Sequence, residues 1–368
     1  MHRCEYIESA RSLFTVHTIE LLTAIHEAKG RQSVRIEAYP ELVDTLVSVA
    51  RIQSTDASNR IEGISTSDHR LQELIRETTT PRNRNEEEIA GYRDVLTLIH
   101  ENHDYIPLTP NVILQLHRDL FRHTPLTFGG HFKDTDNIIV ERLSDGTQSV
   151  RFTPPSSLIT PQLIEQACEA YRAATDGTSW TDPLLATIMF IFDFTCVHPF
   201  NDGNGRMSRL LTLLLLYRSG FNVGKYISLE HIIEQTKDAY YDALAASTKG
   251  WNENSNDYKP FVDYMLGVIL TAYRDFDERM NMIVPDRDDK NLLVTSLNGS
   301  PTKDERIQLL FDRTLKPMSK RDVLTQLPDI SISTVERVLK RMLDEGILLK
   351  IGSGRATRYV KQREPRVA

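Results

Sequence analysis

A short polar stretch between two apolar runs holds residue types that suit phosphate chemistry. The stretch HPFNDGNGRMSR begins at His198, follows DPLLATIMFIFDFTCV and precedes LLTLLLLYRSG. His198 is a natural general base near neutral pH. Asp202 offers the hard oxygen ligands with which Mg²⁺ is held beside substrate phosphates. A pair of buried helices needs neither group, so the stretch indicates a functional site.

The glycines and arginines of the stretch suit an anion. Gly203 and Gly205 permit backbone conformations that are closed to other residues. Their amides, with that of Asn204, precede a predicted helix and can form a concave nest of donors. Arg206 and Arg209 lie three residues apart on the first turn of that helix, so they share a face and can clamp phosphate oxygens. With the histidine and the aspartate, they indicate nucleotidyl or phosphoryl transfer from a metal-bound polyphosphate to a hydroxyl.

A turn that joins two core helices, with its charges in solvent, would account for any single one of these residues. The whole set between two apolar runs favours a site instead. The stretch is not a P-loop, because it lacks the pattern GxxxxGK[ST] and no parallel βαβ pattern surrounds it.

The elements around the stretch are predicted to be mainly α-helical. Apolar residues recur at helical spacing in HTIELLTAIHEAK, ELVDTLVSVARI and EEEIAGYRDVLTLIH, and TPNVILQLHRDLF has the features of a capped helix. One segment differs: β-branched runs on both sides of Asp145–Gly146 predict a β-hairpin, which then leads into RFTPP. Because a lone hairpin is only marginally stable, we expect it to pack against another element.

The chain is too long for one ordinary domain, since it has 368 residues. We predict an N-terminal helical region over 1–105, a core over 106–283, a linker over 284–302 and a further domain over 303–368. In the last of these, three short helical patterns precede ILLKIG and RATRYVK, two strand patterns around a Gly-Ser-Gly turn. That order is typical of a winged helix-turn-helix.

The run from His198 to Arg209 resembles the signature of the Fic family, H-P-F-x-[DE]-G-N-G-R-x-x-R, at every defined position. The resemblance covers roughly residues 109–273, with the hairpin and RFTPP included. It implies an all-α core with a β-hairpin flap that transfers AMP from Mg·ATP to a Ser, Thr or Tyr hydroxyl of a protein, the chain itself included. ATP is then the co-substrate and Mg²⁺ the metal.

The resemblance also implies a role for each matched residue. His198 deprotonates the target hydroxyl, Asp202 holds Mg²⁺, Arg206 binds the phosphates and Arg209 binds the γ-phosphate. The expected anion hole is formed by Gly203, Asn204 and Gly205.

The resemblance implies two further elements outside the signature, the flap and the aromatic residues near the adenine. The flap lies around Lys133–Val140 and registers the backbone of the target by strand addition, with Lys133, Ile138 and Ile139 as docking residues. Tyr240 and Tyr241 resemble the aromatic residues on the adenine side, although tyrosines at helical spacing also occur in ordinary cores.

An upstream segment, TDASNRIEGIS, resembles the family's inhibitory motif, [ST]-x-x-x-E-[GN]. Ser58 and Glu62 are one helical turn apart, and Gly63 is a good helix stop. Alone, this pattern describes a solvated glutamate near a helix end. Beside the signature it implies an inhibitory helix whose Glu62 pairs with Arg209 and keeps ATP from seating productively.

The transferred group and the direction of the reaction stay open. Fic relatives also transfer UMP, phosphate or phosphocholine, and Asp202 at the metal position favours AMP. Removal of AMP uses the same residues, with Glu62 positioning water.

Charge is distributed unevenly along the chain. The net charge is −7, which argues against general nucleic-acid affinity, but 15 Lys and Arg stand against 9 Asp and Glu from Lys303 onward. DNA is thus a candidate partner of the winged helix, through Arg337, Lys340, Arg341, Arg355 and Arg358. Winged helices also dock proteins or dimerise. A nucleotide-sensing DNA-binding regulator, a module that recruits a protein target, and a homo-oligomer therefore stay open as alternatives.

The expected location is the cytoplasm, without a membrane partner. No apolar run reaches the roughly 18 residues of a membrane span, and the start MHRCEYIESARSLF lacks the apolar core of a signal peptide. Three cysteines are too few and too scattered for a disulfide framework or a zinc site, so we expect reduced thiols.

Overall fold

Two compact units make up the chain in the computed structural model. The described residues are 2–142, 148–283, 302–313, 317–352, 354 and 357–361. The first unit consists of Met1–Arg31 and Ala50–Tyr273, and the second of Gln32–Val49 and Arg274–Ala368. The boundary predicted between residues 105 and 106 therefore lies inside the first unit, and the predicted linker, up to residue 301, lies outside the described residues.

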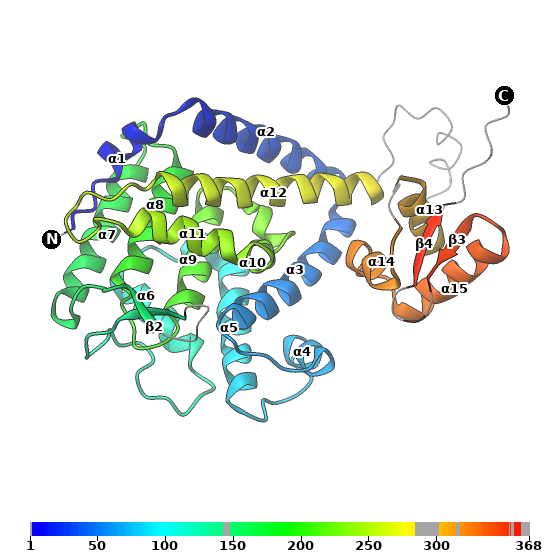
Figure 1. Cartoon of the computed structure of the whole chain (residues 1–368), viewed down its shortest axis with the longest axis horizontal. Coiled ribbons are helices and arrows are strands. Elements are labelled where there is room, and N and C mark those ends of the chain that lie inside the picture. Colours follow the sequence, from blue (N-terminus) through cyan, green and yellow to red (C-terminus); the bar gives the residue numbers. More distant parts are fainter. Residues whose placement is uncertain are drawn as a thin grey trace. The chain divides into compact units, whose positions relative to one another are not determined.

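The fold is mainly α-helical, as the sequence predicts (Figure 1). The helices up to residue 283 are α1 (Tyr6–Leu13), α2 (Val16–Ala38), α3 (Pro40–Ile61), α4 (Asp68–Ile75), α5 (Arg84–Asn102), α6 (Pro110–Leu120), α7 (Thr160–Thr175), α8 (Pro183–Val197), α9 (Asn204–Arg218), α10 (Leu229–Gln235), α11 (Lys237–Thr248) and α12 (Lys259–Ile283). Short 3₁₀ turns are formed by His103–Tyr105, Ser157–Ile159 and Asn222–Lys225. Helices α5 and α6, which lie on either side of the boundary predicted at residue 105, pack against each other. None of the helices in the described part of the chain combines the length and apolar composition that a membrane crossing requires.

Helices α8 and α9 form the centre of the first unit and carry the polar stretch between them. The Asp182 side chain accepts a hydrogen bond from the Leu184 amide at the start of α8, and Pro183 follows at the first helical position. Nearly every residue of both helices is buried, which agrees with the apolar composition of α8 and of the second half of α9. They pack against each other, and Figure 1 shows them in green among the neighbouring helices.

The predicted hairpin is present and contacts α11. Strands β1 (Ile139–Arg142) and β2 (Gln148–Phe152) pair antiparallel, with Val140 opposite Val150. The turn predicted at Asp145–Gly146 lies outside the described residues. From β2, Arg151 donates a hydrogen bond to the carbonyl of Tyr241 and lies over its ring, 5.0 Å from the centroid.

The C-terminal part of the second unit has the element order that the sequence predicts for a winged helix. Helices α13 (Lys303–Arg313), α14 (Lys320–Gln326) and α15 (Ile332–Asp344) precede the antiparallel strands β3 (Leu348–Ile351) and β4 (Arg358–Lys361). Apolar residues from all three helices and both strands form its core, among them Ile307, Val323, Val338, Leu348 and Tyr359. Met318 and Tyr359 exchange two backbone hydrogen bonds, which adds a bridge beside β4.

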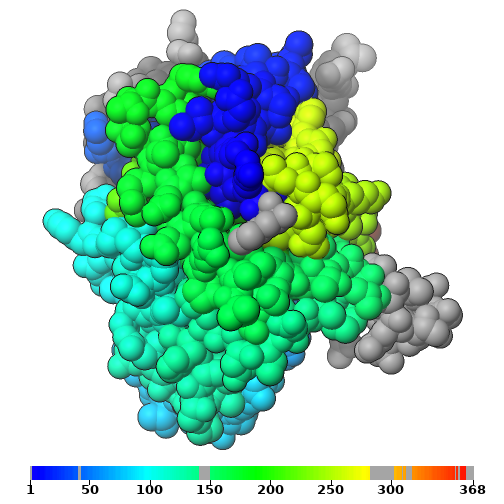
Figure 2. Space-filling view, turned by 90° about the vertical axis from the view of Figure 1, so that its left-hand side faces the viewer, coloured from blue at the N-terminus to red at the C-terminus, as the bar shows by residue number. Residues whose placement is uncertain are grey.

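The N-terminal segment packs onto the first unit through a buried carboxylate. Asp193 of α8 is fully buried and accepts hydrogen bonds from Tyr6 (3.0 Å), Trp251 (2.8 Å) and Tyr258 (2.9 Å). His2 lies 3.1 Å from the same carboxylate and stacks on Trp251. On the face shown in Figure 2, the blue N-terminal segment accordingly lies against green surface.

Candidate active site

The loop between α8 and α9 is held in an uncommon backbone conformation. His198 ends α8 with φ 50° and ψ 61°, the left-handed region that few non-glycine residues adopt. Gly203 precedes α9 with φ 82°. The Asn204 side chain closes the loop, because it accepts from the Phe200 amide (2.9 Å) and donates to the Phe200 carbonyl (2.8 Å). The side chain of Asn204 thus fixes the loop, while its amide lies in the first turn of α9.

The base of the flap supports this loop from the other side. Lys133 donates from Nζ to the Val197 carbonyl (3.0 Å) and to the Asn137 side chain (3.0 Å). Asn137 in turn lies 3.4 Å from the carbonyl of His198. Lys133 is only 3% exposed, so it holds the loop and offers no surface to a docking protein. Among the predicted flap residues, Ile138 has the exposed side chain.

The imidazole of His198 is uncharged at neutral pH. Burial, and then the nearby Lys133 ammonium, lower the pKa of His198 to about 4. Its Nδ1 atom is buried without a hydrogen-bond partner in the protein. A neutral imidazole can accept a proton from a hydroxyl, and His198 lines the cavity described below.

The carboxylate of Glu62 covers the first turn of α9. A Cβ atom built on Gly205 would lie 2.1 Å from Glu62 Oε1, so only glycine lets the carboxylate come this close. The first amides of a helix have no acceptor within the helix, and with the helix dipole they favour an anion. Glu62 therefore lies where an anionic ligand would bind.

Arg209 is fully engaged by the predicted inhibitory motif. It donates to Ser58 Oγ (2.8 Å), to the Ser58 carbonyl (2.9 Å) and to Glu62 Oε1 (2.7 Å). Burial alone would raise the pKa of Glu62, but the charge and hydrogen bond of Arg209 outweigh it and hold that pKa below its usual value. Gly63 follows with φ 79°, as its place after the end of α3 requires. The structure thus brings Ser58 and Glu62 to Arg209.

Arg206 differs from its predicted surroundings. Its side chain is 1% exposed and forms an ion pair with Glu88, at 2.7 Å between Nη1 and Oε2. Its guanidinium lies over the ring of Phe121 at 5.1 Å, and Nη2 is 3.6 Å from Asp202. Arg206 therefore lies beneath the loop, whereas the Asp202 side chain is 44% exposed.

A cavity of about 400 Å³ adjoins these residues. Its lining includes these predicted residues: Glu62, Ile139, His198, Asn204, Gly205, Arg209, Tyr240 and Tyr241. The other predicted residues do not line it: Ser58, Gly63, Lys133, Ile138, Asp202, Gly203 and Arg206. His198, the first turn of α9 and Arg209 thus share one space with the rings of Tyr240 and Tyr241.

Two cations in this cavity were not predicted from the sequence. Arg151 lies over the ring of Tyr241, and Lys237 donates to the Ile61 carbonyl at the end of α3 (3.1 Å). Tyr240 meets Tyr241 edge to face, with ring centroids 5.2 Å apart. The available signal was position in the sequence, since Arg151 is the first residue of RFTPP and Lys237 directly precedes DAYYDAL, two segments singled out for other reasons.

His117 also supports the loop without any sequence signal. Its Nδ1 accepts from the Gly130 amide (3.0 Å), so the proton is on Nε2, which donates to the Asp202 carbonyl (3.0 Å). Its ring stacks on Phe200 at 3.6 Å between centroids. Burial lowers the pKa of His117 to about 4, which keeps this tautomer uncharged.

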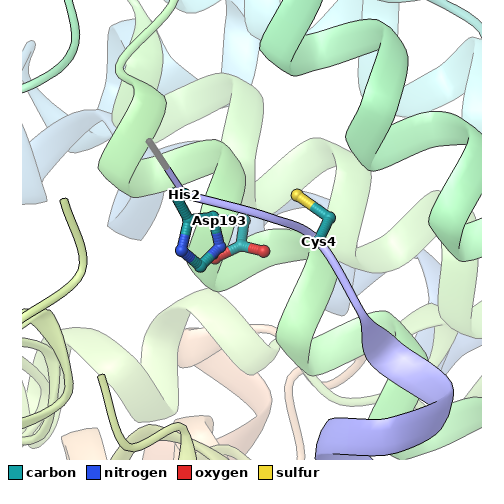
Figure 3. A group of neighbouring side chains, drawn as sticks. All are labelled: His2, Cys4 and Asp193. Atoms are coloured by element: carbon teal, nitrogen blue, oxygen red, sulfur yellow. The ribbon is translucent and has the colours of Figure 1, made fainter. Parts of the chain in front are cut away.

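One cluster in the described part of the chain has metal-ligand chemistry away from the loop. Potential ligand atoms of His2, Cys4 and Asp193 lie within 4.8 Å of one another (Figure 3). The Asp193 oxygens already accept from two tyrosines and a tryptophan. Since those donors satisfy the carboxylate, the cluster acts as a hydrogen-bond network that fastens the N-terminal segment.

Comparison with known proteins gives one family. Residues 107–216 match the model of the Fic/DOC family. The chain is similar to Protein adenylyltransferase fic-1 of Caenorhabditis elegans, 28% identical over 171 residues, which are 46% of this chain and 28% of that protein. It is also similar to Protein adenylyltransferase Fic of Drosophila melanogaster, 24% identical over 282 residues, 72% of this chain and 49% of that protein. The matched region spans half or less of these relatives.

Solved structures share the fold. A Fic family protein from Desulfovibrio desulfuricans G20 superposes with a TM-score of 0.60 at 20% identity, covering 96% of this chain and 98% of that one. Fic-1 (aa134–508) from C. elegans gives 0.54 at 17% identity, with 72% and 73% covered. A Fic domain containing signaling protein from Bacteroides thetaiotaomicron gives 0.54 at 20% identity, with 70% and 95% covered.

Proposed function

Because the chain carries a Fic/DOC family domain over residues 107–216, we propose that it is a protein adenylyltransferase with a built-in brake. It moves AMP from Mg·ATP to a Ser, Thr or Tyr hydroxyl of a protein, itself included. The observation that carries the proposal is the shared cavity, in which His198, the start of α9 and Arg209 surround one space and Glu62 covers part of it.

The chain's own groups account for the transfer. His198, uncharged above its lowered pKa, takes the proton of the target hydroxyl as the hydroxyl oxygen attacks the α-phosphorus of ATP. The bond from that phosphorus to the β-phosphate oxygen breaks, and pyrophosphate leaves with the bonding electrons. The amides at the start of α9 stabilise the negative charge on the phosphate, and Tyr240 and Tyr241 flank the nucleoside.

Asp202 is the residue that would hold Mg²⁺. It is exposed at the start of α9, beside amides that suit phosphate oxygens. Mg²⁺ is usually held by one or two carboxylates together with substrate phosphates, so this single carboxylate fits the ion in the presence of ATP. When bound there, Mg²⁺ offsets the charge of the phosphates.

The brake is the ion pair between Glu62 and Arg209. A charge-assisted hydrogen bond is worth about 1.5–3 kcal/mol, and we expect the lower end because the Glu62 side chain is 34% exposed. At about 1.4 kcal/mol per tenfold change, that lower end is restraint by roughly one order of magnitude. Such a pair regulates the enzyme without abolishing its activity.

The hairpin offers the docking surface for the target. Ile138, Val140 and Val150 all have exposed side chains, at 59%, 43% and 56%. Exposed apolar residues on a two-stranded sheet suit an extended peptide that adds as a further strand. Ile139, which lines the cavity beside Val140, would place that peptide next to His198.

The winged helix-turn-helix is proposed to dock a protein. Arg337 and Arg341 of α15, which would have to contact DNA phosphates, both pair with Asp304 of α13, at 2.6 Å and 2.8 Å. Asp304 thereby offsets positive charge on α15, the helix that would lie in the major groove of DNA in this architecture.

The test is incorporation of labelled AMP from ATP into the chain itself and into lysate proteins. We expect Glu62→Gly to raise incorporation by about tenfold or more, because Arg209 is then free for ATP. The double variant with His198→Ala should lose the gain, since no base remains.

Mass spectrometry of the modified proteins separates the alternatives. A mass increase of one AMP per acceptor supports the proposal, whereas another added group would change the assigned donor. Loss of AMP from a pre-modified protein would assign the reverse reaction. No modification by Glu62→Gly, in a chain that still binds ATP, would leave a nucleotide sensor as the function.

A further inference from the structure

A buried glutamate that takes no part in the proposed transfer lies beneath the active-site loop. Glu88 of α5 has a side chain that is 3% exposed. Its Oε1 accepts from Arg84 Nε at 2.7 Å, and its Oε2 pairs with Arg206 Nη1 at 2.7 Å. Burial of a carboxylate is costly unless it is paired, and Glu88 uses one oxygen for each arginine.

Both of these arginines reach the same second carboxylate. Arg84 Nη2 lies 3.4 Å from Asp202 Oδ2, and Arg206 Nη2 lies 3.6 Å from Asp202 Oδ1. The four side chains therefore form a closed ring in which positive and negative charges alternate. The ring has two charges of each sign, so its other three members, two arginines and Glu88, present one net positive charge to Asp202.

The geometry of Arg206 depends on this ring. The ion pair of Nη1 with Glu88, at 2.7 Å, holds one end of the rigid planar guanidinium in place, and Nη2 lies at its other end. The ring of Phe121 lies against one face of the guanidinium at 5.1 Å and limits its tilt. Nη2 then points at Asp202, the residue proposed to carry the metal.

The charges that surround Asp202 depend on the ring as well. Without Glu88, its carboxylate would face two guanidinium groups with no second negative charge. Two unbalanced positive charges beside a metal ligand oppose the approach of a divalent cation, most strongly where burial limits screening.

We propose that Glu88 is a positioning residue of this active site: it holds Arg206 beside Asp202 and cancels one of the two positive charges that face the metal-binding carboxylate. This inference rests on the proposed function, because it assumes that Asp202 takes Mg²⁺ with ATP.

The direct readout is the gain in ATP affinity that Mg²⁺ produces. ATP is titrated calorimetrically into the Glu62→Gly, His198→Ala chain, which cannot turn over, once with Mg²⁺ and once with EDTA. The ratio of the two dissociation constants measures the metal-dependent gain. We expect Glu88→Gln, which keeps the shape and loses the charge, to reduce this gain about tenfold, as substitutions outside a metal's own ligands commonly do.

A second variant separates charge from geometry. Glu88→Asp keeps the negative charge but is one methylene shorter, so it should retain most of the metal-dependent gain. In the Glu62→Gly chain with His198 intact, the same variant should lower kcat more than it changes KM, because Arg206 loses its orientation. Glu88→Asp also tests the proposal if Glu88→Gln does not fold.

The matched control is Glu86, two residues earlier in the same helix. Its side chain is 4% exposed and is paired with Arg70 at 2.7 Å, outside the ring. Glu86→Gln should lower thermal stability as Glu88→Gln does, but leave the metal-dependent gain unchanged. The inference is wrong if Glu88→Gln leaves the gain intact, or if Glu86→Gln reduces it equally. The binding experiment needs no transfer, so failure of the Glu62→Gly chain to transfer AMP would count against the proposed function alone.

Discussion

At the scale of single residues, the site depends on which groups carry charge at neutral pH. His198 is uncharged because burial and Lys133 lower its pKa to about 4, while Glu62 stays charged because Arg209 lowers its pKa. The base is therefore ready to accept a proton at the same pH at which the brake is closed. Acid would protonate both His198 and Glu62, and so remove the free base and the ion pair.

The first prediction concerns the pH dependence of transfer. An ordinary histidine would lose its basic form as pH falls through its usual pKa of 6.5. With a folded-state pKa of about 4, His198 stays neutral well below that, so transfer by the Glu62→Gly chain should persist to about pH 5. The measurement is the initial rate of AMP incorporation across the acid range, with folding checked by circular dichroism.

The same shift has a consequence for stability with a definite sign. A histidine whose pKa is lower in the folded state binds protons more weakly there, so the folded state loses stability as pH falls below 6.5. His198→Ala removes this term and should lose less stability between about pH 7 and about pH 5. An equal loss in both chains would contradict the lowered pKa.

At the scale of elements, α3 carries the brake and is anchored at two places. One is the contact of Ser58 and Glu62 with Arg209. The other lies one turn earlier, where Ser54 Oγ donates to the fully buried Glu230 at 2.7 Å. Tyr92 of α5 donates to the other oxygen of Glu230 at 3.0 Å. A helix fixed at two successive turns holds the Glu62 carboxylate in one place.

Loss of the second anchor, the hydrogen bond from Ser54 to Glu230, should weaken the inhibition by Glu62 mildly. Ser54→Ala removes a buried hydrogen bond to a carboxylate, worth about 1.5–3 kcal/mol, and should raise AMP incorporation several-fold. Added to Glu62→Gly it should give no further gain, because it acts only through Glu62. Ser48→Ala is the control, since Ser48 is exposed on the same helix and its hydroxyl donates to the Asp44 carbonyl within that helix. A further gain in the Glu62→Gly chain would assign Ser54 some other role.

Much of this arrangement follows from the order of residues along the chain. The helices and the hairpin could be predicted because periodicity and caps are local properties. The signature residues could be predicted because they are continuous in sequence. Glu88, Asn137 and His117 could not, because each acts on a loop tens of residues away or more, and a buried side chain of these types is uninformative until its neighbours are known.

At the scale of the whole molecule, the basic excess of the C-terminal module is less available than its count suggests. The sequence offers five cations for DNA, of which Arg355 lies outside the described residues. Arg337 and Arg341 share Asp304, and Arg358 donates to the Thr357 carbonyl. Lys340 remains with an exposed side chain.

The expected outcome with DNA is therefore negative. The full chain should show no binding to duplex DNA in fluorescence anisotropy at about 50 mM salt, where phosphate contacts are strongest. Asp304→Asn, which frees the two arginines, should bind measurably and weaken steeply towards about 200 mM salt. Tight binding by the unaltered chain would restore the DNA-binding alternative.

The close approach of Glu62 to Gly205 has one more consequence. A carboxylate tethered at 2.1 Å from where a Cβ would stand is an intramolecular ligand, present at an effective concentration set by its helix. Such a competitor lowers the apparent affinity for ATP by the fraction of chains in which the place is free. The difference between the natural chain and Glu62→Gly should then shrink as ATP approaches saturation. On this account the ATP concentration itself sets how strongly Glu62 restrains transfer.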